Sequence, residues 1–522
     1  MKRFKRLFSL LAVAAMVLTM NMTAFAADHS ITIAAAEEGE ASHTFEVYQI
    51  FTGTYGTDDE ENGVLSDLKW GRNGTGTEGE AVPDDVIEAL EAASGNDAEK
   101  LAVIEGYFND ESNSIGTVTS GKSIAVADGY YILIDTTELS GEDDANSTNV
   151  VQVVGEDITV KPKTAKPTVD KEVYDDDDGS ASGDNHGWGE TADHQIGERF
   201  QFKLTAKIDA DADMDAYSAY QVVFQDTMSE GVTFESIESV VINDEIQLNT
   251  GDYTSTAKAG QAGGKWSLTI DNIKDHVRDP LSGGVEIEVI YNAHLNEKAA
   301  VNTPSANGST TNENEVYLQY SNNPNGEGLG ETAPDSVWVF TYEMPNQKVN
   351  DEEQPLEGAG FTLYSGDDPI HVVPGETAGE YRVARIERYD SDTPVYEAGA
   401  VTEMTSAKAD GGDDTPATFN ISGLDAGTYT LKETKTPNGY NTCEDVTIVI
   451  SAVHREGSDG VATTDISMTQ NGEGTDINKI VNESGTILPE TGGIGTIIFY
   501  VVGGVLMVGA AALFITRRRA QK

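Results

Sequence analysis

Cysteine is almost absent from this sequence. Cys443 is the single cysteine among 522 residues, so no disulfide can form within the chain. Exported proteins of several domains are often stabilised by disulfides. If this chain is exported, either its domains are large enough to be stable without disulfides, or a different covalent bond takes their place.

Positive charge is scarce as well. The chain has 33 lysines and arginines against 89 aspartates and glutamates, which gives a formal net charge of −56 at pH 7. A surface this acidic repels phosphate groups, so we expect no nucleic acid among its partners and no binding to anionic lipid headgroups. The charge fits an extracellular protein whose copies repel one another.

Sequence motifs of enzymes and metal proteins are not found. The eight histidines lack the spacing of a zinc site, and neither a GxSxG nor a P-loop pattern occurs. The acidic run Asp175–Asp178 offers carboxylates to a hard cation, but its spacing is not that of an EF-hand and favours a solvated turn. We therefore expect no cofactor, no metal site and no enzyme acting on an external substrate.

Uncharged apolar runs stand near both ends of the chain. Near the start, Leu7–Met20 follows a basic stretch and precedes Ala24–Ala26, which predicts a secretory signal peptide at 1–26. Near the end, Ile494–Thr516 is followed by Arg517–Arg519. At about 1.5 Å per residue this second run is long enough to cross a bilayer core, which predicts a transmembrane helix with its arginines in the cytoplasm.

A pentapeptide precedes the second apolar run: Leu488, Pro489, Glu490, Thr491 and Gly492. Alone it is a weak pattern, but with the apolar run and the basic tail the segment 488–522 resembles the cell-wall sorting signal of Gram-positive surface proteins. The resemblance implies that a sortase cysteine attacks the carbonyl of Thr491 and releases the chain from Gly492 onward. The alternative is a single-pass anchor with a chance pentapeptide.

The residues between these ends predict an all-β protein. Apolar and polar residues alternate in Phe200–Ile208 and Val285–Tyr291, as in half-buried strands, and helical periodicity is best at 84–93. We expect tandem immunoglobulin-like β-sandwiches. Segments 161–168 and 322–335 have the composition of linkers. The predicted units are an N-terminal domain at 27–164, a middle domain at 165–340 and a C-terminal domain at 341–487.

Two of these domains resemble known families. The middle domain resembles the fimbrial isopeptide-forming domain of pilin backbones, with matches at Thr168–Val173, Val222–Phe234 and Asn314–Pro324. The C-terminal domain resembles the collagen-adhesin B-type domain, with matches at Pro355–Tyr364, Phe419–Thr434 and Pro437–Tyr440. Both resemblances imply an autocatalytic Lys–Asn isopeptide bond within the domain, which would explain the missing disulfides.

The resemblance implies two triads of site residues. They are Lys171, Asp226 and Asn314 in the middle domain, and Lys348, Glu433 and Asn482 in the C-terminal domain. Burial would keep each lysine neutral and nucleophilic and each carboxyl protonated, while folding supplies the proximity. Each bond would join the first strand of its domain to the last. In the alternative reading, the lysines are ordinary solvated residues.

A further lysine points to polymerisation. Asp157–Lys163 resembles the pilin motif, whose final lysine, here Lys163, attacks the sortase-bound threonyl group of the next subunit at Thr491. Lys161 stands where the family usually has a tyrosine, and Lys166 follows closely, so the register among the three lysines stays open. A flexible basic linker is the alternative.

Together these features predict the backbone subunit of a covalent fimbria on a Gram-positive surface. Its implied partners are identical subunits joined head to tail, pilin-specific and housekeeping sortases, minor pilins and peptidoglycan. The main alternative is a monomeric wall-anchored adhesin that binds host matrix or glycan, and an accessory pilin is another. The sequence leaves open the receptor, the identity of the sortase and whether the N-terminal domain forms its own cross-link.

Overall fold

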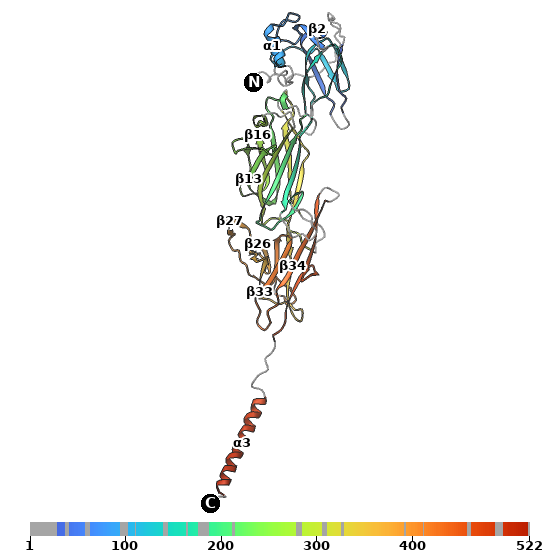
Figure 1. Cartoon of the computed structure of the whole chain (residues 1–522). Helices are drawn as coiled ribbons and strands as arrows, with labels where there is room; N and C mark the ends of the chain where they lie inside the picture. The colour runs from blue at the N-terminus through green and yellow to red at the C-terminus, as the bar shows by residue number, and fades with distance from the viewer. Residues whose placement is uncertain are drawn as a thin grey trace.

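The computed structural model places three β-rich units end to end in an elongated molecule (Figure 1), which confirms the all-β expectation. The structure describes residues 29–36, 41–57, 63–93, 103–109, 111–138, 145–162, 165–175, 187–210, 214–277, 284–304, 311–324, 328–390, 393–410, 412–456, 461–485 and 494–519. The predicted signal peptide, Lys163 and the pentapeptide 488–492 lie outside the described residues.

The N-terminal unit packs two sheets, with strand orders β5-β1-β8 and β3-β2-β6-β7, and β4 pairs with β2. The stretch expected to be helical forms α1, which buries Val86 and Leu90, and Asp84 and Asp85 in its first turn suit the positive end of the helix dipole. The elements are β1 (His29–Ile33), β2 (Thr44–Thr57), β3 (Gly63–Trp70), α1 (Asp84–Ala92), β4 (Gly116–Thr119), β5 (Ser123–Val126), β6 (Gly129–Asp135), β7 (Thr148–Val153) and β8 (Ile158–Val160).

One long strand, β13, connects the two layers of the middle unit. The long strand β13 pairs with β17 through its second half and with β16 and β18 through its first half, with a register shift between Met228 and Thr233. It therefore belongs to both layers. The elements are β9 (Thr168–Asp175), β10 (Gly187–Gly189), β11 (Thr191–Asp193), β12 (Arg199–Ile208), η3 (Met214–Ala216), β13 (Val222–Ile242), β14 (Ile246–Gln247), β15 (Thr254–Ser255), β16 (Gln261–Ile270), η4 (Ile273–Asp275) and β17 (Val285–Leu295).

Three more strands complete the middle unit: β18 (Asn312–Ser321), β19 (Leu329–Glu331) and β20 (Asp335–Phe340). Segment 322–335 was expected to be a linker between domains, but it contains β19. This strand pairs with β18 in antiparallel fashion, with Leu329 opposite Ser321. Glycine, proline and asparagine are as common in the connections between paired strands as in linkers, so composition alone did not distinguish the two. Strand β18 is also not the last of its unit, because β20 pairs with it.

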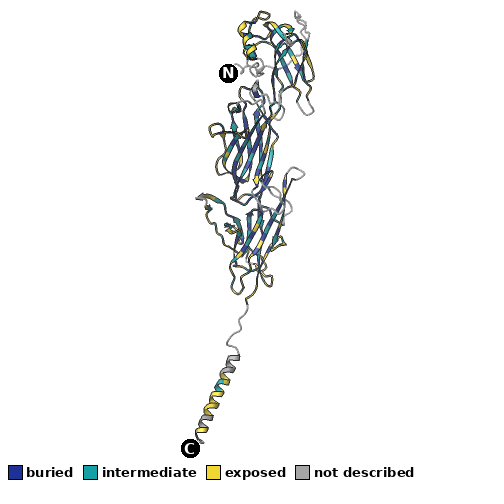
Figure 2. Cartoon of the chain, in the orientation of Figure 1, coloured by how far each residue is buried: buried dark blue, intermediate teal, exposed yellow. Residues whose placement is uncertain are grey.

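The C-terminal unit has strand orders β21-β32-β26-β25, β30-β31-β22-β37 and β24-β23-β33-β34-β35-β36, and β27 pairs with β28. Its elements are β21 (Tyr342–Met344), β22 (Asn346–Asn350), β23 (Gly360–Ser365), β24 (Asp368–Pro369), β25 (Val372–Pro374), β26 (Glu380–Val383), β27 (Ile386–Asp390), β28 (Thr393–Tyr396), β29 (Met404–Thr405), β30 (Ala407–Lys408), β31 (Ala417–Thr418), β32 (Asn420–Leu424), β33 (Gly427–Lys435), β34 (Val446–Glu456), β35 (Ala462–Gln470), β36 (Glu473–Gly474) and β37 (Asn478–Asn482). One continuous hydrophobic core joins this unit to the middle unit, and buried residues follow the strands of all three units (Figure 2).

The helix α3 (Ile494–Arg519) forms where an apolar helix was expected. The structure differs from the predicted transmembrane span, since no helix among the described residues combines the length and apolarity needed to cross a membrane.

Candidate cross-linking sites

The lysine predicted for the middle domain lies in the interior of the sandwich. Successive residues of β9 point to opposite faces, and Lys171, Val173 and Asp175 are the buried ones. The Lys171 Nζ lies 5.3 Å from the ring centre of Phe202 and 5.5 Å from that of Tyr291. The alternative of a solvated strand lysine is therefore wrong for Lys171.

A tyrosine joins the three predicted residues of the middle domain. Lys171 Nζ contacts Asp226 Oδ2 and lies 3.3 Å from the Tyr291 hydroxyl. That hydroxyl donates to Asp226 Oδ2 at 3.0 Å, and Asn314 Nδ2 donates to it at 2.5 Å. Lys171 and Asn314, which lie on β9 and β18, thus both reach the same hydroxyl oxygen on β17.

Burial favours the neutral forms of this cluster. It lowers the pKa of the Lys171 amine, and it raises the pKa of the Asp226 carboxyl and of the Tyr291 hydroxyl. Asp226 Oδ1 and Asn314 Oδ1 are both buried without a hydrogen-bond partner. A protonated Asp226 carboxyl is a hydrogen-bond donor, whereas an ionised one only accepts.

The sequence did not indicate Tyr291. It stands at the end of the alternating run Val285–Tyr291, at a position that points inward. An inward aromatic residue on a strand is ordinarily only a core residue. The one available signal was its hydroxyl, because a fully buried tyrosine hydroxyl usually has a polar partner.

The C-terminal site is built across two neighbouring strands. β22 and β37 are parallel, with Lys348 opposite Ile480, and Asn482 lies two residues further along β37. Lys348, Ile480 and Asn482 are all buried, so they share the inward face. Here too, the reading of the lysine as solvated is wrong.

The third residue of this site comes from the other sheet. Glu433 on β33 accepts a hydrogen bond from Asn482 Nδ2 at 2.7 Å and another from the Cys443 backbone N–H at 2.7 Å. Lys348 Nζ instead donates to the carbonyl oxygens of Val349 and Ile480, at 2.8 and 3.0 Å. The structure thus joins Glu433 directly to Asn482, whereas the lysine is held beside them by backbone groups.

The lysine amine of this site is also shifted toward its neutral form. Burial lowers the pKa of Lys348 to about 8, against the opposing effect of the Glu433 charge. Burial and Glu433 raise the pKa of the Cys443 thiol to about 12, so this thiol is a poor nucleophile at neutral pH. Asn482 Oδ1 is buried without a hydrogen-bond partner.

The residues expected to take part in polymerisation are only partly described. Lys163 and Thr491 lie outside the described residues, whereas Lys161 and Lys166 are exposed between β8 and β9. In the acidic run at Asp175–Asp178, Asp175 is buried at the end of β9 rather than placed in a solvated turn. The other three aspartates of that run are not described.

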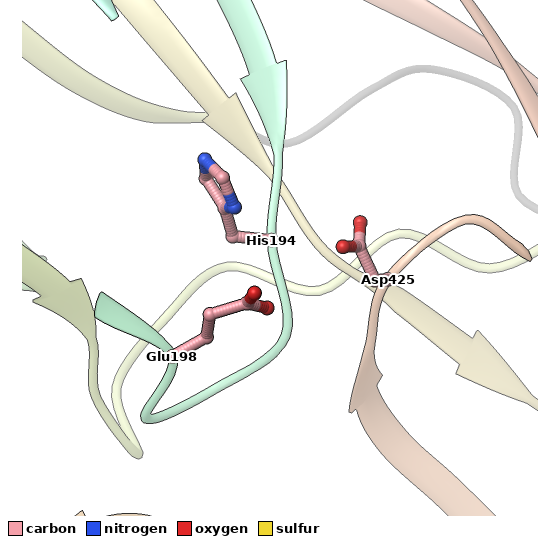
Figure 3. A group of neighbouring side chains, drawn as sticks. All are labelled: His194, Glu198 and Asp425. Carbon is pink, nitrogen blue, oxygen red and sulfur yellow. The ribbon is translucent and has the colours of Figure 1, made fainter. Parts of the chain in front are cut away.

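One group of potential metal ligands occurs among the described residues. It consists of His194, Glu198 and Asp425, whose ligand atoms all lie within 4.8 Å of one another (Figure 3). Spacing along the sequence could not reveal it, because Asp425 belongs to a different unit from the other two residues.

Comparison with known proteins matches two segments to families. Residues 343–463 match the model of the SpaA domain, described as a prealbumin-like fold, and residues 482–522 match the LPXTG cell wall anchor motif. The second match confirms the predicted sorting signal. The chain is also similar to the trypsin-resistant surface T6 protein of Streptococcus pyogenes serotype M6, with 27% identity over 345 residues. That match covers 57% of this chain and 60% of the T6 protein.

Solved structures of pilins are also similar to the chain. The T6 backbone pilin of serotype M6 Streptococcus pyogenes matches with a TM-score of 0.43 and 17% identity, covering 88% of this chain and 99% of that chain. The full-length RrgB pilus protein of Streptococcus pneumoniae matches with a TM-score of 0.41 and 14% identity, covering 89% and 99%. The chain thus carries a prealbumin-like SpaA domain followed by an LPXTG cell wall anchor motif, and it is a cell-wall-anchored surface protein similar to the T6 protein.

Proposed function

We propose that this chain is the backbone subunit of a covalently polymerised pilus, with a Lys–Asn isopeptide bond in each of its middle and C-terminal domains. The supporting observation is that a lysine and an asparagine are buried in each of these two units beside a carboxyl group, which is buried in the middle unit (Asp226) and half-buried in the C-terminal unit (Glu433). Burying polar groups costs free energy unless they are hydrogen-bonded to one another. Apolar residues would fill the same space without this requirement, so packing alone does not explain why these three residue types are there.

In the middle domain, the neutral Lys171 amine attacks the side-chain carbonyl carbon of Asn314. A new C–N bond forms, the original C–N bond of the carboxamide breaks, and its nitrogen leaves as ammonia after gaining the one proton that the lysine amine loses. Asp226, kept protonated by burial, donates to Asn314 Oδ1 as negative charge develops there. The Tyr291 hydroxyl holds the amine and the carboxamide in place through its contacts with both.

In the C-terminal domain, Lys348 attacks Asn482 in the same way. Its pKa of about 8 leaves about a tenth of the amine neutral at pH 7, far more than for a solvated lysine. Glu433 orients the carboxamide through its hydrogen bond with Asn482 Nδ2. It lies beside the departing nitrogen, where it can take up the proton that the Lys348 amine loses and pass it to that nitrogen, which leaves as ammonia.

These bonds suit a protein under tension. A Lys348–Asn482 bond would tie β22, the second strand of the C-terminal unit after the short strand β21, to the parallel strand β37, which is the last. A pulling force would then pass through the bond and leave the strands between them unloaded. In the middle unit the Lys171–Asn314 bond would tie β9 to β18 and shield β12, β13 and β17, while β20 lies beyond it.

Polymerisation would proceed through Lys163 and Thr491. A sortase would cleave after Thr491, and Lys163 of the next subunit, located between β8 and β9, would resolve the intermediate. The product is a head-to-tail filament, because the two joined surfaces are different and the contact does not close on itself. A housekeeping sortase would attach the finished fibre to peptidoglycan, and minor pilins would complete it.

Intact mass spectrometry of the purified chain, followed by peptide mapping, tests the cross-links. Each bond expels one ammonia, roughly 17 Da, so two bonds predict a deficit of roughly 34 Da. Asp226→Asn should halve that deficit by blocking only the middle-domain bond, and Asp244→Asn, an exposed turn residue beyond β13, should leave it intact. A wild-type mass equal to that of the plain sequence would refute both cross-links.

A further inference from the structure

The middle and C-terminal units are in direct contact at their junction. The Ile196 backbone N–H donates to the Gly423 carbonyl at 2.9 Å, across the boundary between the units. A Cβ added at Gly423, whose φ is +87°, would lie 2.6 Å from Ile196 Cδ1, and one at Gly197 would lie 2.6 Å from Arg385 Cα. Side chains that meet here are therefore held in fixed relative positions.

The three potential metal ligands lie at this junction and come from both sides of it. His194 follows β11, and Glu198 directly precedes β12, both in the middle unit. Asp425 stands in the turn between β32 and β33 of the C-terminal unit. Figure 3 shows the three side chains gathered around one space, and their ligand atoms lie within 4.8 Å of one another.

The histidine ring is oriented as a metal ligand. His194 is 1% exposed and stacks on Phe200 with the ring centres 4.3 Å apart and the planes at 2°. Its Nε2 lies 2.9 Å from the Tyr174 carbonyl oxygen. A carbonyl oxygen only accepts, so Nε2 carries a hydrogen, and Nδ1 is the ring nitrogen that can serve as a metal ligand. This backing of one ring nitrogen by a carbonyl is the usual support of a metal-bound histidine.

The two carboxylates are oriented by backbone groups. Asp425 Oδ1 accepts from the Ala426 N–H at 2.9 Å, and Glu198 Oε2 accepts from the Gln195 N–H at 3.4 Å. Both residues also line a cavity of about 630 Å³ between the two units. The cavity gives an ion a route to the site and leaves room for water to complete its coordination.

We propose that His194, Glu198 and Asp425 bind one divalent transition-metal ion, of the Zn²⁺ class, that bridges the two domains. The imidazole nitrogen favours such an ion over Ca²⁺ or Mg²⁺, which prefer ligand sets made of oxygen alone. Two carboxylates balance the two positive charges, and one water fills the fourth position of a tetrahedral site. Because the ligands belong to different units, the bound ion stabilises only the docked arrangement.

Calorimetric titration of the full chain with ZnCl₂, after treatment with a chelator, tests this site. We expect one saturable ion per chain, and we expect Glu198→Gln and Asp425→Asn each to weaken its binding at least tenfold. Asp368→Asn is the matched control, because Asp368 lines the same cavity outside the ligand group. Cys443→Ser is a second control, which tests the only thiol of the chain.

A melting experiment provides an independent readout. Zn²⁺ should raise the unfolding temperature of the wild type and of both controls, and it should raise that of Asp425→Asn much less. Equal unfolding temperatures in chelator would show that the variants are folded. The site is refuted if no saturable ion binds, if Cys443→Ser abolishes binding, or if Asp368→Asn weakens it as much as Asp425→Asn does.

Discussion

Lys348 and Asn482 lie on adjacent parallel strands, with Lys348 opposite Ile480 and Asn482 two residues further along the same buried face. A lysine side chain is long enough to reach across one strand spacing, of about 4.8 Å, to such a diagonal neighbour. The register of β22 against β37 therefore decides whether the bond can form, because a shift of one residue would turn Asn482 to the solvent face.

Losing the C-terminal cross-link should destabilise the protein. In the chain-entropy model, a covalent link that closes the 135-residue loop from Lys348 to Asn482 is worth about 5 kcal/mol. We expect Glu433→Gln to leave the Lys348–Asn482 bond unformed and to lower the unfolding temperature by roughly 10 °C, measured by calorimetry. Lys479→Ala, at an exposed position of β37, should change neither the mass deficit relative to its own sequence nor the unfolding temperature. A cross-linked Glu433→Gln protein would contradict the assigned role of the glutamate.

Removing the Tyr291 hydroxyl should slow the middle-domain reaction without abolishing it. The Tyr291→Phe substitution keeps the ring and its packing but removes the oxygen that contacts Lys171, Asp226 and Asn314. We expect the rate of ammonia loss after refolding, monitored by mass spectrometry, to be about tenfold lower than in the wild type. Tyr317→Phe, on β18 outside the buried cluster, serves as the control. An unchanged rate would show that the hydroxyl has no positioning role.

The rate of the C-terminal reaction should depend on pH. The pKa of Lys348 is lowered by burial from 10.5 to about 8, so the neutral, reactive fraction grows as the pH rises toward 8 and then saturates. We expect cross-link formation in freshly refolded protein to be several-fold faster at pH 8 than at pH 7 and to change little above pH 9. Peptide mapping of samples quenched over time measures this rate. A rate independent of pH between 6 and 8 would contradict the neutral-amine mechanism.

The same shift sets the pH dependence of stability before the bond forms. A lysine whose pKa is lower in the folded state binds fewer protons there than in the unfolded state. The unreacted fold should therefore gain stability as the pH rises from about 8 toward 10.5, and in Glu433→Gln, which lacks the charge that raises the pKa of Lys348, this gain should begin at a lower pH. Denaturant titrations across that range measure the change.

Lys163→Ala should abolish polymerisation. Cells expressing the wild type should yield ladders of very high mass on denaturing gels, and the variant should yield only monomer. Lys161→Ala and Lys166→Ala are the matched controls, because both lysines are exposed close to Lys163 between β8 and β9. If the ladders persist in Lys163→Ala and vanish in one of the other two variants, the lysine replaced in that variant is the reactive one.

Local sequence patterns predicted much of the fold and indicated the candidate cross-linking residues. The alternation in Phe200–Ile208 predicted a strand that the structure contains as β12. The residues Lys171, Asp226 and Asn314, identified from flanking matches, lie within one hydrogen-bonded cluster centred on Tyr291. Composition did less well at 322–335, where a hairpin strand forms in place of a linker.

By itself, the sequence determined the sorting signal, the strand periodicity and the lack of any internal disulfide, since each depends on residues that are close together in the chain or on composition alone. Only the tertiary structure decided that Tyr291 bridges Lys171 and Asn314 and that Asp425 meets His194. The physical reason is that strand register and domain docking set these contacts. Both arise from the packing of residues far apart in sequence, which no local pattern records.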